Sequence, residues 1–203
     1  MGPDEYKEHI DNNAFINYMV NWQFNQALEY MRFLNENHKQ YLKNLKERID
    51  LNDTEIDNWA ELKDKIYLPQ PGEDNIIPQF EGFEDLDEIN LSKYKQGDVG
   101  DIFNDLGWEE IINSKVSKQA DLVMLTYLLE DRFKEEIIKA NFDYYEPLTL
   151  HDSSLSPGIH AAIAGKLGET NKGYELFKRA AQIDLGPNMD SSKAGLHSAS
   201  LGG

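Results

Sequence analysis

The order of helix types in the second half of the chain most constrains its fold. Ser117 to Leu129 is apolar nearly all round, whereas the next stretch, roughly 131 to 141, carries few apolar residues among its charges. The pair recurs, because Pro157 to Leu167 is again apolar on most sides and about 171 to 184 has a single apolar face. That last face consists of Tyr174, Phe177, Ala180 and Ala181. A helix apolar all round is buried, and a one-faced helix lies at the surface. The alternation is typical of the inner and outer helices of an α/α toroid, with a plain helical bundle as the alternative.

Three further helices are predicted in the first part of the chain. Apolar residues recur at helical spacing over about 14 to 34 and occupy two faces, which predicts a helix buried on more than one side. Narrower apolar stripes predict helices over about 36 to 48 and 54 to 66, the second with N-cap candidates at 52 to 54. No strand pattern competes, so the predicted fold class is all-α.

The helical pattern is absent between Leu68 and Asp105. Prolines interrupt this stretch, and the aromatic residues Phe80, Phe83 and Tyr94 are scattered among acids. A linker is one interpretation, but the aromatic residues favour an ordered loop packed on the body or covering a site. We therefore predict one domain over residues 1–203, with an irregular, loop-rich insertion at about 68–113.

Composition excludes several classes of function. The net charge of -17 argues against nucleic acid or an anionic membrane as a partner. The chain of 203 residues has no cysteine, no stretch with the apolar length of a membrane span and no signal-peptide pattern at its start. Its five histidines are too scattered to indicate a metal site. A cytoplasmic protein without a cofactor is the simplest interpretation.

The first candidate for chemistry is the acidic stretch from Gly2 to Ala14. It holds four carboxylates, a histidine and a tyrosine directly before a helix. Neighbouring like charges make each carboxylate harder to ionise, and a carboxyl that stays protonated suits the acid catalyst of glycosidic bond cleavage. Acidic residues also favour helix N-termini through the helix dipole, which is the alternative explanation. We take Glu5 as the candidate acid.

Two more stretches carry polar groups at predicted helix starts. Lys118 and Gln119 could hydrogen-bond sugar hydroxyls, although a lysine there could equally extend along the surface. His151, Ser153 and Ser154 lie just before a helix whose N-terminal N–H groups and dipole favour an anion, although serines are also ordinary N-caps.

These stretches together resemble one enzyme family. Gly2-Pro3-Asp4-Glu5-Tyr6, Lys118-Gln119-Ala120-Asp121, Tyr144-Tyr145-Glu146-Pro147, Leu150 to Pro157 and Gly195 to Gly203 are similar to segments of the disaccharide phosphorylases of glycoside hydrolase family 65. The family includes phosphorylases of maltose, trehalose, kojibiose and nigerose. The match covers about 1 to 30 and 115 to 203. It departs from the family at Lys7, where these enzymes usually have histidine.

The resemblance implies a fold, a reaction and residue roles. The implied fold is part of the catalytic (α/α)6 barrel, and the implied reaction is inverting phosphorolysis of an α-linked glucose disaccharide to β-glucose 1-phosphate and a released sugar. Glu5 would be the proton donor, Lys118 and Gln119 would bind glucose, and Ser153 and Ser154, with His151 less firmly, would bind phosphate. His197, Gly202 and Gly203 would line the pocket.

The resemblance also implies what the chain binds and how it is organised. Its partners would be a disaccharide and inorganic phosphate, with a homodimer as one option for the complete enzyme. We expect the 203 residues to be an inactive piece of a longer enzyme. An α-glucoside hydrolase on the same barrel and a non-catalytic sugar-binding helical module are the alternatives.

Overall fold

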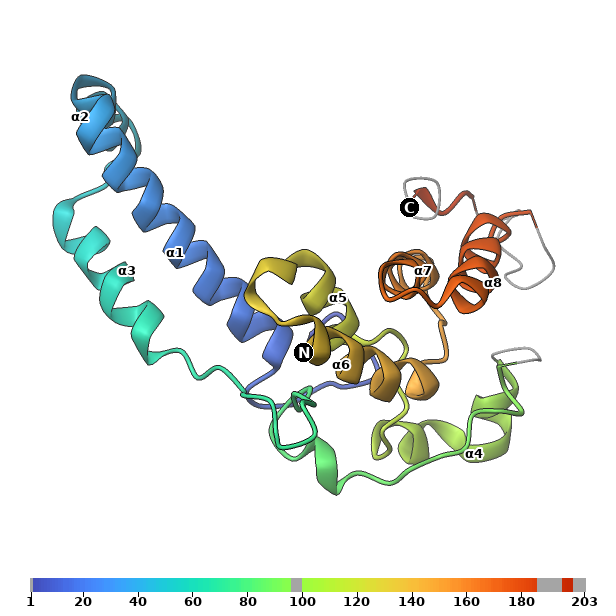
Figure 1. Ribbon diagram of the computed structural model, residues 1–203. Coiled ribbons are helices and arrows are strands. Elements are labelled where there is room, and N and C mark those ends of the chain that lie inside the picture. Colours follow the sequence, from blue (N-terminus) through green and yellow to red (C-terminus); the bar gives the residue numbers. More distant parts are fainter. Residues whose placement is uncertain (1, 96–99, 186–194, 199–203) are drawn as a thin grey trace. The chain divides into compact units, whose positions relative to one another are not determined.

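The computed structural model describes residues 2–95, 100–185 and 195–198 (Figure 1). Within these ranges the protein is helical and forms no β-strand. The α-helices are α1 Ala14–Asn37, α2 Lys39–Ile49, α3 Asp53–Lys65, α4 Gly100–Ile112, α5 Asp121–Leu128, α6 Glu135–Leu148, α7 Ser156–Lys166 and α8 Thr170–Ala181, with short 3-10 turns at Phe83–Asp85 and Glu130–Arg132. The all-α prediction is confirmed, and seven of these helices match predicted ranges. In the same part of the chain, no helix is long and apolar enough to cross a membrane.

The chain divides into two compact units. One comprises Ile16–Leu68, and the other comprises Met1–Phe15 together with Pro69–Gly203. Because the first unit interrupts the second in sequence, the segment before α1 belongs with the helices that follow residue 69. That second unit contains every candidate site residue.

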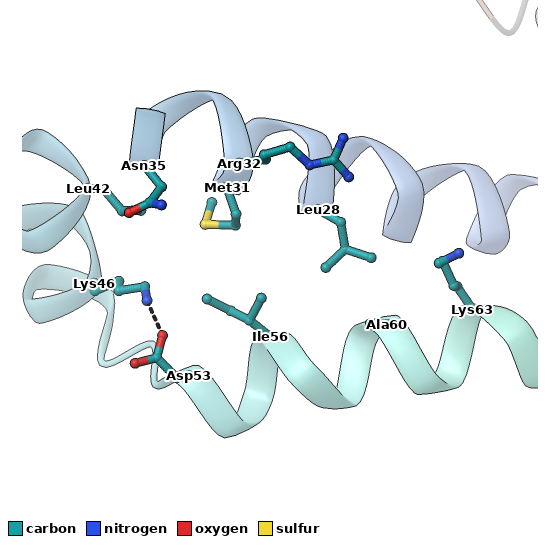
Figure 2. A pocket seen from close by; sticks show the side chains of 10 residues that line it. All are labelled: Leu28, Met31, Arg32, Asn35, Leu42, Lys46, Asp53, Ile56, Ala60 and Lys63. Carbon is teal, nitrogen blue, oxygen red and sulfur yellow. Dashed lines mark hydrogen bonds and ion pairs between the residues drawn. The ribbon is translucent and has the colours of Figure 1, made fainter. Parts of the chain in front are cut away.

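The unit Ile16–Leu68 contains most of α1 together with α2 and α3. Asn52 is the N-cap of α3, where its side-chain oxygen accepts a hydrogen bond from the Glu55 N–H at 2.9 Å, as predicted for this helix start. The three helices line a groove of about 510 Å³, into which Leu28, Met31 and Ile56 project (Figure 2). In α1, Ala14 and Tyr18 are buried and Ile16 is 40% exposed, and burial of this helix on more than one side stays a prediction.

In the other unit, α5, α6 and α7 pack against one another, and α8 packs against α7. α5, α6 and α7 contribute the fully buried side chains Leu122, Leu125, Phe142, Tyr145 and Ile163. The predicted apolar face of α8 is only partly correct. Ala180 is buried, but Tyr174 and Phe177 are 62% and 55% exposed, and the helix instead buries Gly173 and Leu176.

The described residues from 70 to 95 pack on the body of this unit. Phe80, Phe83 and Tyr94 are all buried, as the aromatic residues had indicated. Further along, residues 100–112 form α4, which the sequence did not predict. The extent of the insertion at about 68–113 and its role stay predictions.

Two isolated parallel bridges join segments that are distant in sequence. Asp87 pairs with Ser114, and Ser117 pairs with Thr149. The second bridge is closed by two backbone hydrogen bonds of 2.9 Å, from the Ser117 N–H to the Leu148 carbonyl and from the Leu150 N–H to the Ser117 carbonyl. It therefore sets the chain just before α5 beside the chain just after α6, where the second and third candidate stretches lie.

Candidate active site

The site begins with a buried carboxyl group, Asp4, next to the candidate acid. Asp4 is fully buried, and its Oδ1 accepts hydrogen bonds from the backbone N–H of Tyr6 at 3.2 Å and of Lys118 at 3.0 Å. Its Oδ2 accepts a hydrogen bond from Gln79 Nε2 at 3.1 Å. One side chain thus ties the N-terminal segment to the start of α5. Burial raises the pKa of the Asp4 carboxyl, while these hydrogen bonds and the charge of Lys7 oppose the shift.

A second buried carboxyl group, Asp121, holds the same segment from the first turn of α5. Its Oδ1 accepts the Asp4 N–H at 2.7 Å, and its Oδ2 accepts Asn13 Nδ2 at 2.7 Å. Burial, together with the nearby negative charge of Asp4, raises the pKa of Asp121 to about 7. Gly2 lies so close that a Cβ there would be 2.1 Å from Asp121 Oδ2, so a larger residue would displace the Asp121 and Asn13 side chains.

Glu5 itself is at the surface. Its side chain is 60% exposed and forms an ion pair with Lys118 Nζ, whose side chain is 23% exposed. The structure therefore brings together two residues that the sequence assigned to proton donation and sugar binding. In this N-terminal segment the carboxyl whose pKa burial raises is Asp4, one residue before the candidate acid.

Gln119 connects the N-terminal segment with the serine turn. Its Nε2 donates a hydrogen bond to the Pro3 carbonyl, and its Oε1 accepts one from Ser153 Oγ at 2.6 Å. The amide is buried and bonded at both ends, so in this structure it links the two segments directly. A contact between Gln119 and a sugar stays a prediction.

Tyr6 makes a second link to the same turn. Its hydroxyl donates to Asp152 Oδ2 at 2.8 Å, and its buried ring meets Phe103 and Trp108 of α4 edge-on, at centroid distances of 5.7 and 5.5 Å. Burial and the neighbouring Asp152 raise the pKa of the Tyr6 hydroxyl well above its usual value, so Tyr6 acts as a donor. The residues on both sides of Glu5 are thus fixed relative to Ser153.

The turn from His151 to Ser156 leads directly into α7. Ser153 and Ser154 are partly exposed, and Ser153 Oγ also accepts the Leu155 N–H at 3.3 Å. α7 has proline in its first turn, where a missing N–H costs nothing. The two serines therefore precede a helix N-terminus, as the sequence predicted.

His151 lies beneath this turn. Its backbone φ is 57°, its side chain is 2% exposed and its Nδ1 is 2.8 Å from Ser156 Oγ. Burial lowers the pKa of the ring to about 4, so it is neutral at pH 7. In this structure the ring supports the turn, and direct contact with phosphate stays a prediction.

The structure also shows the surroundings of Lys7 and His197. Lys7 is buried, and its Nζ donates hydrogen bonds to the carbonyls of Ile111, Ile112 and Ser114 at the end of α4. His197 Nδ1 is 2.8 Å from Asp184 Oδ1. Gly202 and Gly203 lie outside the described residues.

Sequence patterns did not identify Asp4 and Asp121 as the residues that build the site. Both lie inside the stretches that resemble the family, but the sequence does not distinguish a buried acid from a solvated one. The available signal was position: Asp4 directly precedes the candidate acid, and Asp121 directly follows the Lys118-Gln119-Ala120 run.

Comparison with known proteins places this arrangement in a family. A family model described as "Glycosyl hydrolase family 65 central catalytic domain" matches residues 1–203. A kojibiose phosphorylase from Halothermothrix orenii is 49% identical over all of this chain, which spans 26% of that protein. A maltose phosphorylase from Bacillus subtilis is 32% identical, again over all of this chain and 26% of the relative.

A solved structure gives the same result at the level of the fold. The structure titled "Putative kojibiose phosphorylase from human microbiome" superposes with a TM-score of 0.83 at 26% sequence identity. The match covers 99% of this chain and 27% of the other. The chain therefore corresponds to about a quarter of the length of these relatives, and its helices are consistent with part of an α/α barrel.

Proposed function

This chain belongs to glycosyl hydrolase family 65, and on that premise we propose that it supplies part of the active site of an inverting disaccharide phosphorylase. The substrates are an α-linked glucose disaccharide and inorganic phosphate, and no cofactor takes part. The products are β-glucose 1-phosphate and the released sugar. Residues 1–203 are part of the catalytic domain.

The observation that carries this proposal is a continuous set of contacts between the candidate acid and the candidate phosphate site. Glu5 pairs with Lys118, Gln119 bonds both Pro3 and Ser153, and Tyr6 bonds Asp152. Residues 5, 118, 119 and 153 come from three separate stretches of sequence. Their assembly is what a reaction between a glycosidic bond and an anion requires, because both reactants must be held in one place.

In the proposed reaction, Glu5 donates a proton to the glycosidic oxygen as the bond from that oxygen to the anomeric carbon breaks. A phosphate oxygen attacks the anomeric carbon from the opposite face and forms the new C–O bond, so the configuration inverts. The leaving sugar departs with the bonding electron pair and the proton from Glu5. Phosphate is already an anion, and a second carboxylate is not needed as a base.

The remaining candidates bind the reactants. Ser154 donates a hydrogen bond to phosphate at the start of α7, where the helix dipole favours an anion. Ser153 does the same when its hydroxyl, which donates to Gln119 Oε1 in this structure, turns towards the phosphate. Lys118 and Gln119 bind glucose hydroxyls, and a sugar hydroxyl joins Glu5 as a partner of the Lys118 ammonium. His151, neutral and buried, keeps the serine turn in place from below and completes the phosphate site.

The test is Glu5→Gln in the full-length protein, assayed with α-glucobioses and phosphate. Because glutamine cannot donate the proton, we expect a loss of phosphorolysis of at least about 100-fold with unchanged folding. Glu8→Gln is the matched control, since Glu8 is an equally surface-exposed acid three residues away. Retained turnover in Glu5→Gln would falsify the acid assignment. Glucose release without phosphate would instead indicate a hydrolase, and sugar binding without turnover a binding module.

A further inference from the structure

We propose that Asp4 and Asp121 form a buried clamp that positions Glu5 against Lys118 and the leaving oxygen, making them positioning residues for the acid step. This inference rests on the proposed function, because it concerns how that same acid is aimed. Neither residue contacts the reactants in the reaction described above. Both act through the backbone of the residues that do.

The two carboxyl groups hold the backbone on both sides of the Glu5–Lys118 pair. Asp4 Oδ1 accepts the N–H of Lys118 itself and the N–H of Tyr6, the residue after Glu5. Asp121 Oδ1 accepts the N–H of Asp4, the residue before Glu5. The same two buried side chains therefore hold the backbone around both Glu5 and Lys118, although 113 residues separate these two in sequence.

The clamp residues and the residue that they hold differ in burial. Asp4 and Asp121 are both fully buried, whereas the Glu5 side chain is 60% exposed and has no comparable packing of its own. An exposed side chain has many rotamers, so its catalytic geometry depends on how firmly its backbone is fixed. Fixing that backbone needs buried hydrogen bonds, because water does not compete for them.

Burying two carboxyl groups together is unfavourable for the stability of the fold. Each loses hydration, and each opposes ionisation of the other. An apolar pair would fill the same space without that penalty, but it would not accept the N–H groups of Asp4, Tyr6 and Lys118. The arrangement is consistent with a need to orient these particular groups.

The chain itself offers a conservative rescue variant. In Asp4→Asn the side-chain oxygen can still accept the Tyr6 and Lys118 N–H groups. The new amide N–H₂ would face Gln79, whose Oε1 is buried and has no hydrogen-bond partner in the described part of the chain. A flip of the Gln79 amide presents that oxygen as the acceptor. Asp4→Ala removes every one of these contacts.

The experiment compares two substrates in the full-length protein with phosphate. One is the preferred α-glucobiose, and the other is α-glucosyl fluoride, whose fluoride leaves with its bonding electrons and needs little proton donation. In Asp4→Ala we expect kcat for the disaccharide to fall about 100-fold, as a displacement near 1 Å can cause, and kcat for the fluoride to fall less than about 3-fold. Asp4→Asn should retain kcat for the disaccharide within about 3-fold of wild type, because it keeps the acceptor.

Asn141→Ala is the matched control for loss of a buried polar clamp. Asn141 is fully buried, and its Oδ1 accepts the Ile77 N–H at 3.0 Å, so it ties two segments together as Asp4 does. It lies outside the proposed site. We expect this variant to lower the thermal midpoint and to leave both kcat values unchanged.

Three results would overturn the clamp: full disaccharide turnover in Asp4→Ala, equal losses on both substrates, or a loss in Asp4→Asn as large as in Asp4→Ala. If Asp4→Ala does not fold, Asp121→Ala tests the second half of the clamp with the same expectation. If neither variant folds, the disaccharide kcat of Asp4→Asn decides, and a loss greater than about 3-fold would overturn the clamp. A wild-type protein without phosphate-dependent turnover would overturn the proposed function, and this inference with it.

Discussion

At the scale of single residues, neighbouring acids at the start of the chain have opposite environments. Asp4 is fully buried and Glu5 is exposed, although they are adjacent. The chain here is not helical, so consecutive side chains point in different directions and one can pack inward while the next faces solvent. The buried carboxyl organises hydrogen bonds, and the exposed one is available to a substrate.

The serine turn gives the first residue-scale prediction. Ser154→Ala should raise the KM for phosphate about 10-fold with little change in the KM for the disaccharide, because it removes one hydrogen bond to a charged ligand. Initial rates with each substrate varied in turn measure both constants. Ser92→Ala, in an exposed turn far along the chain from the site, is the control. Equal increases in the two constants would mean that Ser154 only caps α7.

Asp121 gives a prediction for pH. Its pKa of about 7 in the folded protein lies above the ordinary value of 3.8, so between these pH values the folded state keeps a proton that the unfolded state has lost. This group therefore stabilises the fold fully below about pH 4, and its contribution is lost as the pH rises through 7. Relative to Asp121→Asn, which does not titrate, the thermal midpoint of the wild-type protein should fall from pH 4 to pH 7.

The same comparison separates the effect of Asp121 on the pH dependence of stability from that of His151. Burial lowers the pKa of His151 to about 4, which makes stability rise with pH between about 4 and 6.5, the opposite trend. Both proteins contain His151, so its effect cancels in the difference between their thermal midpoints. A difference that is constant with pH would contradict the assignment of a raised pKa to Asp121.

The candidate residues for the chemistry could be found in the sequence, but the residues proposed to position them could not. Glu5, Lys118, Gln119 and Ser153 stand in recognisable runs, and the structure brings them together. Asp4 and Asp121 stand in the same runs, yet their role depends on burial and on hydrogen bonds between positions 117 residues apart. No local pattern reports such a contact.

At the scale of secondary-structure elements, periodicity located seven helices and missed α4. Gly107 explains the failure, because it interrupts α4 with a non-helical backbone at φ 77° and ψ 166°. Periodicity also assigned Tyr174 and Phe177 to the buried face of α8, but both side chains are exposed. Helical spacing shows which residues share a face, but it does not show which side of the helix a neighbour covers.

Gly107 itself gives the element-scale prediction. Gly107→Ala should destabilise the protein by about 1–3 kcal/mol, because this backbone conformation is almost exclusive to glycine. A Cβ at 107 would meet nothing within 4 Å, so the cost comes from the backbone alone. Thermal or chemical unfolding measures the difference.

Gly165 is the matched control for this substitution. It lies inside α7, and a Cβ there also meets nothing within 4 Å, but its backbone is helical. Gly165→Ala should therefore stabilise the protein by about 0.5–1 kcal/mol. If the two substitutions changed stability in the same direction, the account of the α4 interruption would be wrong.

At the scale of the whole molecule, the chain contains two compact units, and only one carries the candidate site. The unit Ile16–Leu68 follows the acid segment directly in sequence. This division could not be predicted from the sequence, because the helical patterns within 16–68 resemble those in the rest of the chain. Hydrophobic periodicity describes one element at a time, whereas a compact unit is defined by contacts between elements.

In the proposed mechanism, a proton donor at Glu5 and an anion site at Ser153 and Ser154 act on opposite faces of one sugar. The most direct measurement is the anomeric configuration, determined by proton NMR, of the sugar phosphate that the full-length protein forms from an α-glucobiose and inorganic phosphate. We predict β-glucose 1-phosphate, formed only when phosphate is present. An α-anomeric product, or glucose released at the same rate without phosphate, would contradict the account.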